Sequence, residues 1–260
     1  MRLAVAATAS FGADVLELLA ASHDIAFLLT RPDARRGRGR KLAPPPAKAT
    51  AERLGITVHQ PPKPELPAEA DVVVVCAYGL YIPPSLLERS LWLNVHPSLL
   101  PRWRGAAPVE RAILAGDERA GVTIHRTVEA LDAGPIAAQR AFPIGDLDAG
   151  AVYARAAPLA VRLLEDVLPA PSFTPQAEEG ATYAEKIGPE DRRLDLGDPA
   201  DAVRRVRALS PHIGARAELR GRTVTIWRAH LDEEGRFVPE VVQPDGRRAM
   251  SYDEFLRGVR

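Results

Sequence analysis

Three polar side chains near the middle of the chain could together carry out acyl-transfer chemistry. Asn94 and His96 lie two residues apart in the stretch LWLNVHPSLLPRWRG, and Pro97 follows the histidine. Residues two apart on a strand point to the same side, and a proline ends the strand because it has no N–H to donate. Asp132 lies in the turn-rich sequence LDAGP after the next apolar run. If the two strands are neighbours, all three side chains meet at one edge of a sheet.

An amide, an imidazole and a carboxylate suit the transfer of an acyl group to an amine. An amide N–H can donate to the oxyanion of a tetrahedral intermediate, which is usually the largest catalytic contribution. A histidine exchanges protons near neutral pH, and a carboxylate stabilises its charged form. Taken singly, each residue also has an ordinary structural interpretation: a turn asparagine, a hydrogen-bonded core histidine and an Asx-turn aspartate. Spacing by itself leaves both interpretations open.

Short apolar runs alternate with amphipathic segments through the first two thirds of the chain. The predicted strands cover 3–7, 25–29, 72–77, 91–96, 122–128 and 137–144, and the predicted helices cover 12–21, 47–54, 107–115 and 151–168. This alternation is typical of an α/β fold with a mainly parallel, Rossmann-like sheet and helices on both faces. The carboxyl ends of such strands form the crevice in which parallel sheets bind ligands.

The pattern stops in a proline-containing polar stretch, PAPSFTPQAEEG, and a second unit follows it. In that unit, Asp198-Pro199 is typical of a helix start, and Arg220-Gly221 separates two runs that read as a hairpin. We therefore expect a catalytic domain at 1–168, a linker at 169–182 and a small β-rich domain at 183–260.

Composition restricts the partners and the compartment. The 34 basic and 34 acidic residues cancel, so a polyanion can be bound only through a local basic patch. Such a patch lies at 31–48, the basic segment, where seven basic residues accompany a single acidic one. Cys76 is the only cysteine and the histidines fit no metal-ligand spacing, so we expect a reducing, cytoplasmic location and no metal. No apolar run approaches the length of a membrane span.

The stretches LNVHPSLLPRWRGAAPVERAILAGD and GVTIHRTVEALDAGPI resemble the formyltransferase family that uses 10-formyltetrahydrofolate. The resemblance extends over nearly the whole chain and is greatest to members that act on methionyl-tRNA. It implies that Asn94, His96 and Asp132 are catalytic and that the formyl group passes directly to the α-amine of methionyl initiator tRNA. The folate-contacting residues that it implies are Ser98, Leu99, Leu100, Pro101, Ala77, Tyr78, Gly79 and Leu80. The tRNA-binding residues that it implies are Arg36, Arg38, Arg40 and Lys41.

Two departures from the family pattern keep alternatives open. The first strand-to-helix turn reads Ala-Thr-Ala-Ser-Phe where relatives carry Gly-Thr-Pro-x-Phe, and only 230–240 stands where relatives have further strands of an OB-like barrel. We therefore expect a shortened, open C-terminal domain. We also expect a monomer, because one chain with two domains can contact tRNA without a partner. The alternatives are a formyltransferase for a small amine, such as an amino-sugar nucleotide, and a non-catalytic folate- or RNA-binding paralogue.

Overall fold

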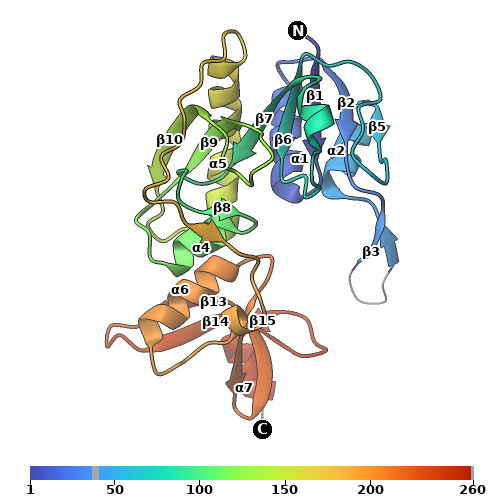
Figure 1. The fold of residues 1–260 in the computed structure, drawn as a ribbon. Coiled ribbons are helices and arrows are strands. Elements are labelled where there is room, and N and C mark those ends of the chain that lie inside the picture. The colour runs from blue at the N-terminus through green and yellow to red at the C-terminus, as the bar shows by residue number, and fades with distance from the viewer. Residues whose placement is uncertain (37–40, 259–260) are drawn as a thin grey trace. The chain divides into compact units, whose positions relative to one another are not determined.

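The computed structural model describes residues 1–36 and 41–258, and only the backbone of Arg36 (Figure 1). The large sheet has seven strands in the order β10-β9-β7-β6-β1-β2-β5. These strands are β1 (Leu3–Ala7), β2 (Ile25–Leu29), β5 (Val58–His59), β6 (Val72–Cys76), β7 (Leu91–His96), β9 (Arg119–Arg126) and β10 (Ile136–Pro143). The helices that accompany them are α1 (Ser10–Ala20), α2 (Pro46–Arg53), α3 (Pro84–Leu87), α4 (Pro108–Leu114) and α5 (Ala149–Val167).

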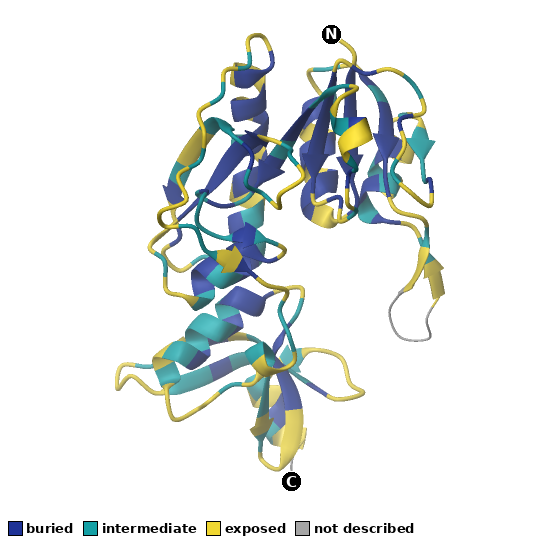
Figure 2. Cartoon of the chain, viewed as in Figure 1, coloured by how far each residue is buried: buried dark blue, intermediate teal, exposed yellow. Residues whose placement is uncertain are grey.

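The predicted α/β architecture is confirmed. Neighbouring strands from β5 to β7 are parallel, whereas β9 pairs with β7 in the antiparallel direction. Strands β1 and β6 are buried at every position, as central strands covered on both faces must be. In Figure 2, the central strands of this sheet are accordingly dark blue, the colour of buried residues. The chain runs through β1, β2 and β5 in one direction and then places β6 and β7 on the other side of β1, so the topological switch point lies between β1 and β6.

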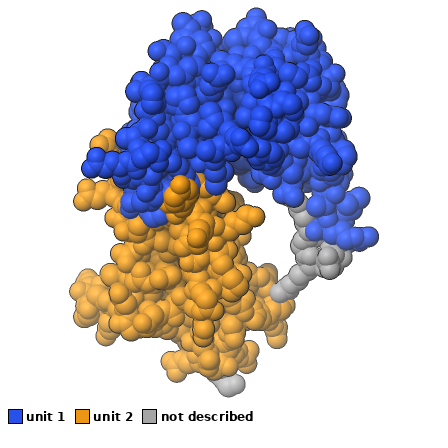
Figure 3. Space-filling view, viewed as in Figure 1, with its two compact units in different colours: residues 1–104, 121–141, 154–182 blue, residues 105–120, 142–153, 183–260 orange. Residues whose placement is uncertain are grey.

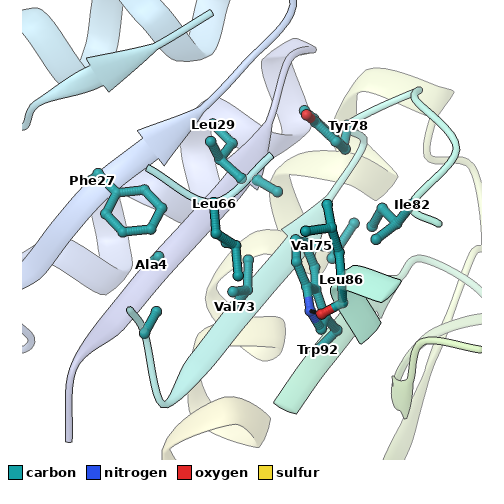
Figure 4. Close-up of a cluster of buried hydrophobic side chains, with 12 residues drawn as sticks. Ala4, Phe27, Leu29, Leu66, Val73, Val75, Tyr78, Ile82, Leu86 and Trp92 are labelled. Carbon is teal, nitrogen blue, oxygen red and sulfur yellow. Dashed lines mark hydrogen bonds between the residues drawn. The ribbon is translucent and has the colours of Figure 1, made fainter. Parts of the chain in front are cut away.

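One face of the sheet carries a cluster of buried side chains (Figure 4). Phe27 and Leu29 of β2, Val73 and Val75 of β6, and Trp92 of β7 contribute to it. Segments between β5 and β7 cover this face, and the Trp92 indole Nε1 donates to the Leu86 carbonyl of α3 at 2.9 Å. The cluster therefore fixes β7, the strand that carries Asn94 and His96, to the centre of the sheet.

The chain divides into two compact units (Figure 3). Residues 105–120 and 142–153 group with 183–260, and the remainder forms the first unit. The second unit contains α6 (Pro199–Leu209) and a four-stranded antiparallel sheet in the order β12-β13-β14-β15. Its strands are β12 (Ala215–Leu219), β13 (Arg222–Leu231), β14 (Phe237–Pro244) and β15 (Met250–Ser251), and α7 (Tyr252–Gly258) follows them.

Local signals in the second unit have the predicted effect. The Asp198 side chain accepts from the Asp201 N–H and caps α6. Arg220 and Gly221 both have positive φ, of 54° and 69°, as the tight turn between β12 and β13 requires. The small β-rich domain is thus present, with an open sheet of four strands in the described residues.

Several short elements were not predicted from the sequence. They include α3, α7, a pairing of β8 (Arg104–Gly105) with β11 (Tyr183–Ala184), and η1 (Glu190–Arg192). The basic segment forms an antiparallel pair, β3 (Ala34–Arg36) and β4 (Lys41–Ala43). Such short elements have no hydrophobic periodicity of their own, so no sequence pattern reveals them. In residues 1–36 and 41–258, no helix has both the length and the apolar composition needed to cross a bilayer.

Candidate active site

Strand β7 carries Asn94 and His96, and it pairs with β9. In the antiparallel register, Asn94 lies opposite His125, and His96 lies opposite Thr123. Side chains of such cross-strand pairs lie on the same face, so Asn94 and His125 are direct neighbours. The Asn94 Nδ2 atom lies 3.1 Å from His125 Nε2. Both histidines are almost fully buried, at 4% and 1% exposure.

A tight turn after β9 brings Asp132 back to this edge. The Arg126 N–H donates to the Pro135 carbonyl at 2.9 Å, which closes the loop between them. Gly134 fits the turn because a Cβ there would lie 1.7 Å from the Arg126 carbonyl oxygen. Asp132 itself has a φ of 48°, a left-handed conformation that is unusual for a non-glycine residue. Its Oδ1 atom accepts from Asn94 Nδ2 at 3.0 Å.

The Asp132 carboxylate lies between two imidazoles. Its Oδ2 atom is 3.7 Å from His96 Nδ1, and its Oδ1 atom is 3.7 Å from His125 Nε2. The other nitrogen of each ring faces a backbone carbonyl: Trp103 for His96 at 2.8 Å, and Arg126 for His125 at 3.0 Å. Because a carbonyl can only accept, Nε2 of His96 and Nδ1 of His125 carry hydrogen. A second proton on His96 therefore binds at Nδ1, beside the carboxylate.

Opposing effects act on His96. Burial lowers its pKa below the ordinary value of 6.5, and the neighbouring His125 lowers it further. The Asp132 carboxylate and the Trp103 carbonyl raise it, because both stabilise the imidazolium. Burial is the largest effect, so the net direction is downward. The resting side chain is consequently a neutral base whose protonated form depends on Asp132.

Both N–H groups of Asn94 are engaged. One donates to Asp132 Oδ1, and the other is directed at the bare Nε2 atom of His125. Donation from Asn94 to a substrate oxygen therefore requires one of these contacts to be exchanged. The contact with His125 is the weaker one to lose, because hydrogen bonds to a charged carboxylate are roughly twice as strong as those between neutral groups.

Polar groups of the loop after β7 hydrogen-bond within the loop and to the neighbouring strand β9. The Ser98 hydroxyl donates to the Arg102 carbonyl at 2.7 Å, and the Ser98 carbonyl accepts from the Thr123 hydroxyl at 2.7 Å. Ser98 and Leu100 are buried, whereas Leu99 and Pro101 are partly exposed. Of the predicted folate contacts in this loop, the latter two present more side-chain surface to a ligand.

The predicted contacts at 77–80 follow directly after β6. Ala77 and Gly79 are exposed and have positive φ values of 48° and 74°. Tyr78 is buried in the cluster of Figure 4, and burial raises the pKa of its hydroxyl to about 12. The Thr8 hydroxyl of the first strand-to-helix turn donates to the Tyr78 carbonyl at 2.8 Å. The altered first turn thus supports the backbone at 77–80.

A separate open hollow of about 330 Å³ lies beside the Asp132 turn. It is lined by residues 126–129, by Pro135, and by Pro84, Leu87 and Glu88 of α3 and its C-terminal end. None of the predicted folate contacts lines it. At its margin, the Tyr81 hydroxyl donates to Glu129 at 3.3 Å.

The predicted tRNA-binding residues are placed only in part. Arg38 and Arg40 lie outside the described residues, and Arg36 ends β3. Lys41 begins β4 and is exposed. The base of the segment is fixed by Lys48, whose Nζ donates to Asp33 at 2.9 Å.

Sequence reasoning missed two residues that contact this site from the predicted linker. Gln176 donates to the carbonyls of Asp132 and Gly134, and Thr182 accepts from the Trp103 N–H. Polar residues in a proline-containing stretch carry no local signal of such contacts. In the described part of the chain, this site included, no group of three His, Cys, Asp or Glu side chains could hold a metal ion. Cys76 is buried, and burial raises the pKa of its thiol.

Comparison with known proteins identifies the relatives of this chain. A model of the formyl transferase family matches residues 1–168, and a model of the formyl transferase C-terminal domain matches residues 186–239. A methionyl-tRNA formyltransferase of Novosphingobium aromaticivorans is 40% identical over 292 aligned positions, covering 99% of this chain and 97% of the relative. The alignment is longer than the 260 residues of the chain, so the relative contains residues that this chain lacks.

Solved structures agree in fold. HypX from Aquifex aeolicus superposes with a TM-score of 0.72 at 21% identity, covering 100% of this chain and 48% of that longer one. A methionyl-tRNA formyltransferase from Clostridium thermocellum superposes with a TM-score of 0.65 at 15% identity, covering 94% and 98%. Since the first family model alone spans well over half of the residues, the chain belongs to the formyl transferase family.

Proposed function

We propose that this chain transfers the formyl group of 10-formyltetrahydrofolate to the α-amine of methionyl initiator tRNA. The observation that carries the proposal is the convergence of Asn94, His96 and Asp132 at one edge of the sheet in a formyl transferase family member. The acceptor follows from relatives named methionyl-tRNA formyltransferase, such as the one matched over 97% of its length.

The reaction needs no covalent enzyme intermediate. The α-amine attacks the formyl carbon, the new N–C bond forms, and the bond to N10 of the folate breaks. Tetrahydrofolate leaves with a proton on N10, and the attacking amine loses one. Asn94 and protonated His96 stabilise the oxygen of the tetrahedral intermediate, and Asp132 keeps the imidazolium charged and correctly oriented.

The remaining predicted residues are assigned to substrate binding. Residues 77–80 and 98–101 contact the folate, and Arg36, Arg38, Arg40 and Lys41 bind the acceptor end of the tRNA. The domain at 1–168 performs catalysis, 169–182 connects it, and 183–260 assists tRNA binding as a shortened OB-like domain. A monomer in the cytoplasm fits a substrate that one two-domain chain can contact by itself.

The test is formyl transfer by the purified protein from 10-formyltetrahydrofolate to methionyl initiator tRNA, with an amino-sugar nucleotide as the rival acceptor. We expect transfer to the tRNA, and a loss of about 10²–10⁴-fold in His96→Ala, the usual contribution of a general acid–base. Transfer only to the sugar amine would identify a small-amine formyltransferase. Folate binding without transfer to either acceptor would identify a non-catalytic paralogue.

A further inference from the structure

Gln176 connects the segment at 169–182 to the turn that carries Asp132. Its Nε2 atom donates to the Asp132 carbonyl at 2.8 Å and to the Gly134 carbonyl at 2.6 Å. These two bonds hold the backbone on either side of Ala133. Asp132 has a positive φ of 48°, a strained conformation that persists only where surrounding contacts impose it.

The orientation of the Gln176 amide is fixed from its other side. Its Oε1 atom accepts from Arg104 Nε at 3.2 Å and from Arg104 Nη2 at 3.1 Å. The Arg104 side chain is only 3% exposed, and it also pairs with Glu178. A guanidinium can only donate, so it holds the amide oxygen on its own side and directs both Nε2 hydrogens at the turn.

Thr182 acts in the same way on the carbonyl partner of His96. Its hydroxyl oxygen accepts from the Trp103 N–H at 2.9 Å, and its carbonyl accepts from the Arg104 N–H at 2.8 Å. Trp103 also has a positive φ, of 68°, and its carbonyl accepts from His96 Nε2 at 2.8 Å. The rotation of the imidazole therefore depends on a backbone that Thr182 holds.

We propose that Gln176 and Thr182 are positioning residues for formyl transfer. Each fixes one strained non-glycine residue: Gln176 fixes Asp132, and Thr182 fixes Trp103. Together they set the distance between the Asp132 carboxylate and His96 Nδ1. This inference rests on the proposed function, because it assigns these residues a role only through Asp132 and His96.

The first test is Gln176→Glu, which is isosteric. The variant keeps acceptors for Arg104 but places a carboxylate oxygen against two carbonyls in place of the amide donors. We expect kcat to fall by about 10²-fold, the cost of a displacement near 1 Å, with both KM values within about threefold of wild type. Glu179→Gln is the matched control, since Glu179 is an exposed glutamate of the same segment. It should retain wild-type kcat.

A double-mutant cycle separates positioning from general structural support. If Gln176 acts through Asp132, then Gln176→Glu should cost little further activity in an Asp132→Asn background. An equal loss in both backgrounds, or wild-type kcat in the single variant, would overturn the proposal. If wild-type protein itself shows no transfer to either acceptor, the proposed function fails instead, and the two failures are thereby distinguished.

If Gln176→Glu does not fold, a second pair of variants tests the positioning role at Thr182. Thr182→Val removes the acceptor for the Trp103 N–H at nearly constant volume, whereas Thr182→Ser keeps it. We expect kcat to fall about tenfold in the valine variant and to recover in the serine variant. Wild-type kcat in Thr182→Val would refute the positioning role.

Discussion

Replacement of Asp132 by Asn removes the charge beside His96 at nearly constant side-chain volume. The carboxylate is 10% exposed, and its Oδ2 atom lies 3.7 Å from His96 Nδ1. At an effective dielectric constant of about 20, a full charge pair at that distance is worth about 4 kcal/mol. Loss of this stabilisation from a transition state that contains imidazolium corresponds to about 10³-fold in rate. We therefore expect Asp132→Asn to lower kcat by about that factor.

The assay is single-turnover formyl transfer at saturating folate and tRNA, which reports chemistry apart from product release. Asp24→Asn is the control, because Asp24 is an exposed aspartate of the same unit, after α1. Circular dichroism should show unchanged folding in both variants. A rate within about threefold of wild type for Asp132→Asn would refute the reasoning, since it would mean that no imidazolium forms beside the carboxylate.

Three further predictions concern pH, stability and salt. Burial holds the pKa of His96 below its ordinary value of 6.5, so the contribution of this residue to stability is present above pH 6.5 and is lost as the pH falls through the lower pKa of the folded state. We therefore expect His96→Gln to flatten the decline of Tm with acidification. A decline as steep as that of the wild type would contradict this prediction. Burial raises the pKa of Glu110, which accepts from the Tyr153 hydroxyl at 3.1 Å, so its stabilising contribution is present below pH 4.5 and is lost as the pH rises through the higher pKa of the folded state. We expect Glu110→Gln to raise Tm, by more at pH 7 than at acidic pH. The same Tm difference between variant and wild type at both pH values would show that burial of the Glu110 charge costs nothing. Neutralising the four predicted tRNA-binding residues should raise the KM for tRNA and flatten its salt dependence relative to the exposed control Lys63→Ala, and equal kinetics in both variants would exclude a phosphate-binding role.

The sequence determined the scaffold because its signals are local. The predicted strands at 3–7 and 25–29 match β1 and β2, since continuous apolar runs between turn residues specify buried strands. The prediction at 91–96 matches β7, where Pro97 follows the last strand residue. The spacing of Asn94 and His96 likewise placed both side chains on one face of a strand. The sequence motifs around Asn94, His96 and Asp132 then identified the family, which the two matching family models confirm.

Only the tertiary structure decided how the site is assembled. The bond from Gln176 to Asp132 joins residues 44 positions apart, and the bond from Trp103 to Thr182 joins residues 79 apart. No periodicity links such pairs, because their contact arises from the path of the chain and not from the repeat of a helix or strand. The protonated nitrogen of each histidine and the engagement of both Asn94 hydrogens follow from carbonyls and side chains that the fold supplies. The residue types are thus local information, whereas their protonation and orientation depend on the environment that distant segments create.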